Sequence, residues 1–323
     1  MSNDKRIRVG IIGTGRMASA RGEALQKSER AQLDWVCSRS PGKGDHFAGE
    51  FGAERVFTDW EKALAETGTE AVIVTTPNSL HEQMGVAALE AGKDVLMEYP
   101  LAPTEEEAQN LIDAAERNRA VLHPGLTYRL AGKTNRIKGA VEGLGQVGFC
   151  RSLQCSGRDI SRWFDDRNLL GNVFVGSNIH FLDEMIYWFG EVRWVEGGLY
   201  EEGRGGKIER DVGSVMLSFL EGPLAQVTYA RGWASPGLGF GMEIIGRGGY
   251  LVDDGKRLIL KSPAGEEELS YPQVNSVLKD TRAFLDLISA GTQPPYTAEE
   301  ARYAVRVAGA ANRSAREGKR IEI

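Results

Sequence analysis

The stretch Val9-Gly10-Ile11-Ile12-Gly13-Thr14-Gly15-Arg16-Met17-Ala18 decides how the first part of this chain folds. It has the pattern of a buried strand that ends in a G-x-G-x-x-A turn and opens a helix. Gly13 permits the tight turn, Gly15 lets backbone amides approach a pyrophosphate, and Ala18 keeps the helix close to the sheet. The helix N-terminus adds N–H donors and a partial positive charge. A dinucleotide is therefore predicted to bind at Gly13, Thr14, Gly15, Arg16 and Met17.

Strands and helices alternate behind this motif as far as about residue 125. Apolar runs predict strands at Arg8–Ile12, Gln32–Cys37, Ala71–Thr75, Asp94–Met97 and Ala120–His123. Helical stretches such as Leu80–Ala91 and Thr104–Asn118 separate them, the second with Thr104 as N-cap. Such alternation implies parallel strands joined by right-handed crossovers. We expect residues 1–125 to form an NAD(P)-binding Rossmann domain with a doubly wound parallel sheet.

The pattern changes after residue 126. Alternating segments such as Val215, Leu217 and Phe219 predict a large, open and mostly antiparallel sheet, interrupted by a helix at about Asn178–Phe189. Residues 126–323 are expected to form an α/β domain for substrate binding and oligomerisation. Helices cover one face of an open sheet, so the other face is polar or pairs with a second subunit. A homodimer or homotetramer is the predicted assembly.

Composition excludes several classes of protein. The 323 residues carry a net charge of -6, whereas nucleic-acid-binding proteins usually present a basic face. No 18-residue apolar run occurs, and the start lacks an apolar signal-peptide core, so a cytoplasmic protein is expected. The three cysteines and four histidines show no metal-ligand spacing, and no metal is predicted. A small-molecule substrate remains the expected partner.

The end of the second strand selects the cofactor. An acidic residue there would hold the ribose 2′-hydroxyl of NAD. This chain instead has Ser38 and Arg39, followed by Ser40-Pro41 and Lys43. The guanidinium fork of Arg39 suits a 2′-phosphate, and Ser38 is able to hydrogen-bond to it. Ser40-Pro41 predicts an N-cap and first-turn proline. NADP(H) is the predicted cofactor, with NAD(H) as the alternative; a solvated surface arginine is the competing interpretation.

Four segments together resemble the Gfo/Idh/MocA oxidoreductase family, namely Gly13-Thr14-Gly15, Thr75-Thr76-Pro77-Asn78-Ser79-Leu80-His81, Ala91 to Leu101 with Glu98-Tyr99-Pro100, and Ile179-His180-Phe181-Leu182-Asp183. The resemblance covers essentially the whole chain. It implies a Rossmann domain followed by an α/β domain. It also implies that Thr75, Thr76, Pro77, Asn78 and His81 lie along the cofactor, and that Glu98 lies near the nicotinamide ribose.

The chain departs from this family at two catalytic positions. Tyr99 stands where the family has lysine, and Gly176 stands where it has aspartate, while His180 remains. A phenol with a reference pKa of about 10 keeps its proton at neutral pH and suits donation. Tyr99 and His180 are therefore the predicted catalytic residues of an NADPH-dependent reductase of a small carbonyl, imine or conjugated substrate. For His180, a hydrogen-bonded core residue is the alternative.

Two other functions stay open. Glu98-Tyr99-Pro100-Leu101 is similar to biliverdin reductases, which implies bilin reduction. The family also includes regulators that keep the fold and lose the catalytic lysine, which implies a non-catalytic NADP sensor.

The predicted substrate pocket draws on arginine and aromatic side chains, which suit planar or anionic molecules. Its candidates are Arg129, Arg158, Arg162, Trp163, Phe164 and Asp183, next to a predicted loop from Gly171 to Gly176. A solvated loop with one core tryptophan is the competing interpretation.

Overall fold

The computed structural model describes residues 6–66, 68–157, 162–233 and 240–323. Its contacts divide the chain into two compact units: Met1–Thr127 with Asn275–Arg302, and Tyr128–Val274 with Tyr303–Ile323. The chain first passes from one unit to the other after Thr127, close to the domain boundary expected after residue 125. The segment 275–302, however, was expected in the second domain and packs in the first unit, because Phe284 and Leu285 are buried in that unit's core.

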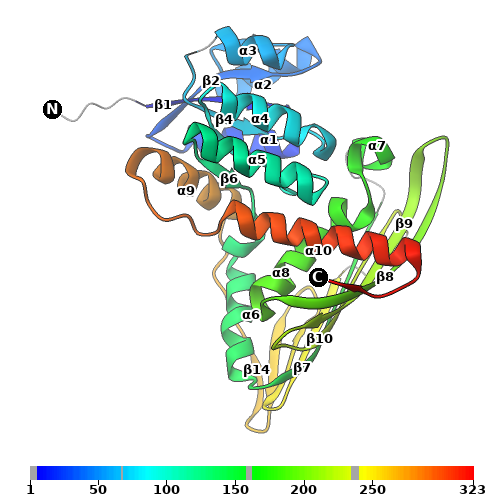
Figure 1. Ribbon diagram of the computed structural model, residues 1–323. Helices are drawn as coiled ribbons and strands as arrows, with labels where there is room; N and C mark the ends of the chain where they lie inside the picture. The colour runs from blue at the N-terminus through cyan, green and yellow to red at the C-terminus, as the bar shows by residue number, and fades with distance from the viewer. Residues whose placement is uncertain (1–5, 67, 158–161, 234–239) are drawn as a thin grey trace. The chain divides into compact units, whose positions relative to one another are not determined.

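The first unit contains a six-stranded sheet in the order β3-β2-β1-β4-β5-β6, with all neighbouring strands parallel (Figure 1). Its elements are β1 (Ile7–Ile12), α1 (Arg16–Gln26), β2 (Ala31–Cys37), α2 (Pro41–Phe51), β3 (Arg55–Phe57), α3 (Trp60–Glu66), β4 (Ala71–Val74), η1 (Asn78–Leu80), α4 (His81–Glu90), β5 (Asp94–Met97), α5 (Glu105–Asn118), β6 (Leu122–Pro124) and α9 (Ser276–Ala290). This order confirms the doubly wound parallel sheet and places a topological switch point between β1 and β4. The sequence prediction lacked β3, whose three residues are too few for a recognisable apolar run.

Side-chain packing explains two features of this sheet. All four residues of β4 are fully buried, as expected where helices cover both faces of a parallel sheet. Gly10 of β1 lies against Trp35, and a Cβ atom there would come within 2.2 Å of the indole ring. The Trp35 indole N–H donates to Thr69 Oγ1 at 2.8 Å, which fixes the ring. Thr104 caps α5 as predicted and forms a reciprocal capping box with Glu107.

The second unit contains a nine-stranded sheet in the order β14-β13-β12-β11-β7-β10-β9-β8-β15. Its elements are η2 (Thr127–Leu130, at the boundary), α6 (Gly132–Gly143), β7 (Val147–Ser156), η3 (Arg162–Asp165), α7 (Arg167–Leu170), η4 (Phe174–Asn178), α8 (Ile179–Phe189), β8 (Val192–Arg204), β9 (Lys207–Phe219), β10 (Leu224–Arg231), β11 (Phe240–Gly246), β12 (Gly249–Asp253), β13 (Leu258–Ser262), β14 (Gly265–Glu268), α10 (Ala298–Glu317, at the boundary) and β15 (Ile321–Glu322). Strands β7 and β10 pair in parallel, and the other printed pairs are antiparallel. The expected mostly antiparallel sheet is confirmed.

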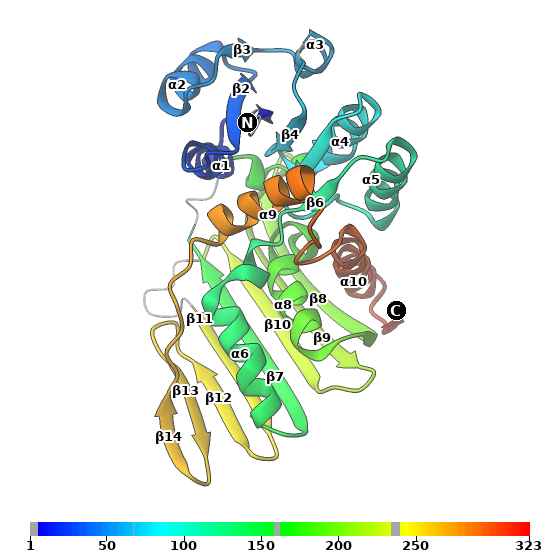
Figure 2. The same cartoon turned by 90° about the vertical axis from the view of Figure 1, so that its left-hand side faces the viewer.

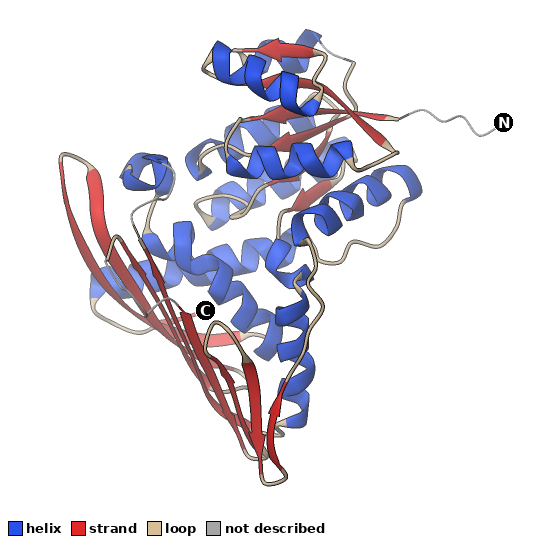
Figure 3. Ribbon diagram, turned by 180° about the vertical axis from the view of Figure 1, so that it is seen from behind, coloured by secondary structure: helices blue, strands red, loops and turns tan. Residues whose placement is uncertain are grey.

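Helices α6 and α8 lie on one face of this sheet (Figure 2). Figure 3 shows the strands of this sheet nearly edge-on, in red, with these helices on one side only. In β9, Val215, Leu217 and Phe219 are buried and their neighbours are half-exposed, which confirms the predicted alternation.

The structure corrects the prediction of a loop from Gly171 to Gly176. Residues 173–178 are helical, and Phe174–Asn178 form a π-helical turn that runs directly into α8. A helix therefore begins at residue 173, between the two glycines that suggested a loop. Within the described ranges, no helix is long and apolar enough to cross a membrane.

Candidate cofactor and catalytic site

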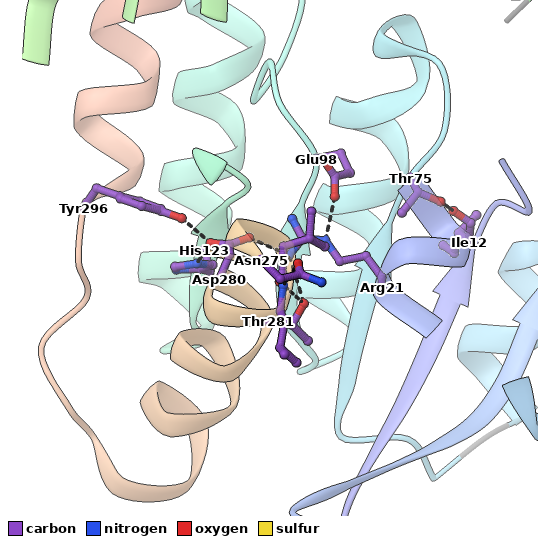
Figure 4. Close-up of polar contacts among 11 residues, drawn as sticks. Ile12, Arg21, Thr75, Glu98, His123, Asn275, Asp280, Thr281 and Tyr296 are labelled. Carbon is purple, nitrogen blue, oxygen red and sulfur yellow. Dashed lines mark hydrogen bonds and ion pairs between the residues drawn. The ribbon is translucent and has the colours of Figure 1, made fainter. Parts of the chain in front are cut away.

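The glycine turn after β1 is built by close backbone approach. Gly13 has φ 118°, and a Cβ atom there would lie 2.4 Å from Thr75 Oγ1. The Gly13 N–H donates to Cys37 O at 2.9 Å, while the Thr75 hydroxyl donates to Ile12 O at 3.0 Å (Figure 4). These bonds hold the carboxyl ends of β1, β2 and β4 together, and only glycine fits at residue 13.

Gly15 differs from Gly13 because no packing inside the chain requires it. It is the N-cap of α1, and no atom of the described residues lies within 4 Å of a Cβ atom built there. Arg16 beside it is exposed, and the first turn of α1 contains no acidic residue. An open glycine before the N–H groups of a helix start is the arrangement that receives a pyrophosphate. The geometry therefore fits the predicted dinucleotide.

The loop after β2 has the features expected for a 2′-phosphate site. Ser40 is the N-cap residue of α2 and Pro41 begins the helix, as predicted, although the Ser40 side chain makes no cap bond. Ser38 is buried, with its hydroxyl 3.1 Å from Thr14 Oγ1 and 3.3 Å from the Ser40 amide that donates to it. Arg39 and Lys43 are exposed. Ser38 therefore organises the loop, and Arg39 is the side chain that reaches solvent.

The segment after β4 contains the residues predicted to lie along the cofactor, from Thr76 and Pro77 to Asn78 and His81. Asn78 is buried in the short η1 helix. His81 is also buried, with Nδ1 2.8 Å from Pro100 O and Nε2 3.0 Å from Thr76 O. Burial lowers the pKa of His81, partly opposed by those carbonyls, so the ring is neutral at pH 7. His81 thus braces the loops after β4 and β5, and its place along the cofactor stays a prediction.

Glu98 and Tyr99 follow β5 and are both buried. The Glu98 carboxylate accepts from Arg21 Nε at 2.7 Å (Figure 4). Burial raises the pKa of Glu98, and the Arg21 charge and hydrogen bond oppose that rise. Tyr99 is 7% exposed at the carboxyl end of the parallel sheet, the edge where such sheets bind ligands.

Arg21 joins Glu98 to a buried polar cluster that sequence reasoning missed. The Arg21 guanidinium lies 2.5 Å from Asp280 Oδ2 and donates to Thr281 Oγ1 at 3.0 Å. Asp280 also accepts from Tyr296 and lies 2.7 Å from His123 Nε2 (Figure 4). We call Arg21, Glu98, His123, Asp280 and Tyr296 the Arg21 cluster.

The two carboxylates of the Arg21 cluster have opposite pKa shifts. For Asp280, burial acts to raise the pKa, but Arg21, His123 and Tyr296 together lower it. Glu98 has fewer donors and its pKa stays raised. The pKa of Arg21 is raised, since its two carboxylates outweigh the effect of burial. Arg21 therefore carries a permanent charge that both acids need.

His180, the other predicted catalytic residue, lies in the second unit near the start of α8. Its ring stacks on Tyr128 with centroids 4.9 Å apart, and it is half-buried. That exposure does not match the core alternative considered for His180. Tyr99 belongs to the first unit and His180 to the second.

Gly176, where the resemblance led us to expect aspartate, lies tightly against Leu170. A Cβ atom at Gly176 would lie 2.1 Å from Leu170 Cδ1, and Leu170 is fully buried. The Leu170 side chain therefore occupies the space that a side chain at residue 176 would need.

Arg129 and Asp183, both predicted to bind substrate, bind each other. Arg129 Nε and Nη2 donate to the two Asp183 carboxylate oxygens at 3.0 and 2.8 Å, and both residues are buried. The fork that was expected to recognise an anion is used to fasten η2 to α8. The substrate role predicted for both residues stays a prediction.

Trp163, also predicted to bind substrate, lies in η3 and packs on Phe164 with centroids 4.0 Å apart. Both rings are half-buried. The side chain of Arg162 and the whole of Arg158 lie outside the described residues.

A Rossmann unit with an open glycine helix start, joined to a unit with a large mixed sheet, defines a class of nucleotide-dependent oxidoreductases. Two family models extend this assignment. The NAD-binding Rossmann model of the Gfo/Idh/MocA oxidoreductase family matches residues 7–126, and the C-terminal alpha/beta model matches residues 138–323. The chain belongs to the Gfo/Idh/MocA family and is an NAD(P)-dependent oxidoreductase.

Several known proteins resemble the chain over its length. It is 23% identical over 333 residues to myo-inositol 2-dehydrogenase of Thermotoga maritima, covering 98% of each chain. It is 26% identical to biliverdin reductase of Synechocystis sp. PCC 6803, solved with biliverdin and NADP+, with a TM-score of 0.89 over 95% and 98% of the two chains. It is also 26% identical to GenD2 from gentamicin A biosynthesis, solved with NAD, with a TM-score of 0.85 over 99% and 97%.

Proposed function

We propose that this protein uses NADPH to reduce a small carbonyl, imine or conjugated substrate, with Tyr99 as the proton donor. The observation that carries the proposal is the buried Tyr99 at the carboxyl end of β5, where the resembled family has lysine. A phenol with a reference pKa of about 10 holds its proton at neutral pH, whereas acting as a base would require a large shift. Reduction consumes a proton, so it matches what Tyr99 is able to give.

The nicotinamide, when bound, supplies a hydride to the electrophilic carbon of the substrate. The Tyr99 hydroxyl then gives its proton to the oxygen or nitrogen that gains the electron pair, and solvent returns a proton to the phenolate. Glu98 precedes Tyr99 directly and is held by Arg21 at 2.7 Å, so the Arg21 cluster fixes the backbone that presents the phenol. Asp280, His123 and Tyr296 act through Arg21 as positioning residues.

The variant Tyr99→Phe tests the proton transfer. Turnover is expected to fall by about 10² to 10⁴, the range for loss of a general acid, while NADPH affinity is kept. Steady-state NADPH oxidation across a panel of carbonyls, imines and conjugated ketones gives the first quantity. Quenching of tryptophan fluorescence gives the second. Full turnover in Tyr99→Phe would show that another group donates the proton.

The preference for NADPH is supported by Arg39 and Lys43, which are exposed beside the start of α2, and by the absence of an acid at the end of β2. Arg39→Ala is expected to weaken NADPH binding at least tenfold and to leave NADH binding within about twofold, because a charged hydrogen bond to the 2′-phosphate is lost. Arg30→Ala, on the exposed loop before β2, is the matched control. Tighter binding of NADH than of NADPH by the natural chain would overturn the preference.

Bilin reduction is a second candidate. It is supported by the fit to the Synechocystis biliverdin reductase, with a TM-score of 0.89, and by Glu98-Tyr99-Pro100-Leu101. Loss of biliverdin absorbance with NADPH measures it directly. NADPH that binds with no oxidation by biliverdin or by any panel substrate would favour the third function, a non-catalytic NADP sensor.

A further inference from the structure

The second unit contains a cavity that the proposed reaction does not use. It has a volume of about 290 Å³. Its lining includes residues of α6 and α8, the two helices that Figure 2 shows on one face of the sheet. We call it the α6–α8 cavity. Residues of η2, α6, α8, β7 and β11 line it, so each wall belongs to one unit. A volume near 300 Å³ is at the lower end of the range for small-ligand sites.

Three aromatic side chains form much of the wall, namely Tyr128, Phe181 and Trp188. Trp188 is held in place because its indole N–H donates to Thr134 O at 3.1 Å. Tyr128 also stacks on His180, so the cavity adjoins that residue. Aromatic faces carry negative electrostatic potential and attract organic cations.

Glu184 adds a carboxylate to the same wall. Its Oε1 accepts from Thr134 Oγ1 at 2.6 Å. Lys133 also lines the cavity, but its ammonium lies 2.6 Å from Asp253 Oδ2, which balances its charge. Glu184 is therefore the residue that gives the lining its negative charge.

Burial raises the pKa of Glu184 to about 7. The Thr134 hydrogen bond and the Lys133 charge act to lower it, whereas Asp183 and Asp253 raise it further. A carboxyl group in this state gains stability from a cation placed beside it. A carboxyl group with a perturbed pKa that lines a cavity is a candidate ligand site.

We propose that the α6–α8 cavity binds the ammonium group of a small amine with an apolar body, with Glu184 as its counter-ion and the three aromatic rings around it. Met185 and Met242 supply adaptable apolar surface for the body. The proposal is independent of NADPH and of Tyr99, so the failure of one leaves the other standing.

Three probes of equal shape and different charge test the site: phenethylamine, 2-phenylethanol and 3-phenylpropionate. Calorimetric titration at pH 8 is expected to show one site that prefers phenethylamine over the alcohol by about tenfold and rejects the acid. Glu184→Gln keeps the size of the side chain and is expected to abolish that preference. Glu142→Gln, at an exposed position of α6, is the matched control and should bind like the natural chain.

Affinity for phenethylamine is expected to rise several-fold between pH 6 and pH 8, as Glu184 ionises while the amine stays charged. The other titratable or charged groups that act on Glu184 or are affected by it are Lys133 of α6, Asp183 of α8, Asp253 of β12 and Cys150 of β7. Glu184→Gln should show a flat profile over the same range.

The location is checked by NMR of the tryptophan indole N–H groups, with Trp188 identified through Trp188→Phe. Phenethylamine is expected to shift the Trp188 signal at the concentration that saturates the calorimetric site. Equal binding of phenethylamine and 2-phenylethanol, or saturation without movement of Trp188, would overturn the proposal. Both measurements are made on the natural chain, with Trp188→Phe needed only to assign the signal, so they decide the matter even if Glu184→Gln does not fold.

Discussion

At the scale of single residues, Arg21 provides a buried positive charge that pairs with two carboxylates of the first unit. It is fully buried and faces both Glu98 and Asp280. Arg21→Met is expected to lower the free energy of unfolding by about 3–5 kcal/mol, because two buried carboxylates lose their counter-ion. Urea denaturation at pH 7 measures the change.

Arg30→Met is the control for that substitution. Arg30 pairs with Asp286 on the surface, with side chains 60% and 41% exposed. Its loss should change the free energy of unfolding by at most about 1 kcal/mol. Similar losses for both arginines would show that the Arg21 cluster is not electrostatically special.

Glu184 predicts a specific dependence of stability on pH. Its folded pKa of about 7 lies above the unfolded value, so the folded chain binds the proton more tightly. The resulting stability is complete below about pH 4.5 and is lost as pH rises through 7. Relative to the natural chain, Glu184→Gln is therefore expected to gain about 1–3 kcal/mol of unfolding free energy between pH 5 and pH 8, with partial solvent access reducing the effect.

Denaturation of the natural chain and Glu184→Gln at both pH values measures this as a double difference, which cancels the other titrating groups. A difference that does not change with pH would show that Glu184 has an ordinary pKa.

Sequence reasoning succeeded for residues whose roles are local. Gly13 and Ser40-Pro41 take the conformations that their own spacing requires. It missed Asp280 and the pairing of Arg129 with Asp183, because these partners are distant in sequence; Arg21 and Thr281 are 260 residues apart. Arg21 did leave a trace, since it lies on the apolar face of α1 with the buried Ala18 and Leu25.

At the scale of elements, the helical turn before α8 depends on Gly176. Alanine normally stabilises a helix relative to glycine by about 0.5–1 kcal/mol. At residue 176, however, the new Cβ atom meets Leu170, so Gly176→Ala is expected to destabilise the protein by about 1–3 kcal/mol. Gly176→Asp, which restores the family residue, should cost more, because a carboxylate is buried as well.

Gly139→Ala in α6 is the matched control, because no atom of the described residues lies within 4 Å of its Cβ position. It should stabilise the protein slightly. The double variant Gly176→Ala with Leu170→Ala should lose less unfolding free energy than the sum of the losses in the two single variants, because the leucine no longer blocks the space. Thermal unfolding reports all three, and strict additivity would contradict the steric explanation.

Elements with strong periodicity were predictable. Five of the six strands of the first sheet, β3 being the exception, and the alternation in β9 agree with sequence patterns within one or two residues. The helical segment 173–178 was not, because Gly171 and Gly176 suggested a loop, whereas the contact of Gly176 with Leu170 depends on tertiary packing.

At the scale of the whole molecule, we propose that the chain self-associates through the sheet of the second unit. Leu224, Phe149 and Ile245 are directly opposite one another on the adjacent strands β10, β7 and β11. Leu224 is 45% exposed and Ile245 48% exposed. An apolar row of this kind on an open sheet suits pairing with a second copy.

Sedimentation velocity is expected to show a dimer or tetramer for the natural chain and a shift toward monomer for Leu224→Asp with Ile245→Asp. Glu142→Gln, at an exposed position of α6 outside the sheet, is a control that should not alter the mass. A monomeric natural chain at micromolar concentration would contradict the proposed self-association.

The return of segment 275–302 to the first unit has a consequence for synthesis on the ribosome. Nascent domains usually fold in order from the N-terminus. Here the nucleotide unit lacks Asp280, Phe284 and Leu285 until residues 128–274 of the second unit have been translated. Nascent chains stalled at residue 274 should therefore have a protease-sensitive first unit that becomes resistant only once α9 emerges. The site that appears first in the reading frame would be among the last to become able to bind its ligand.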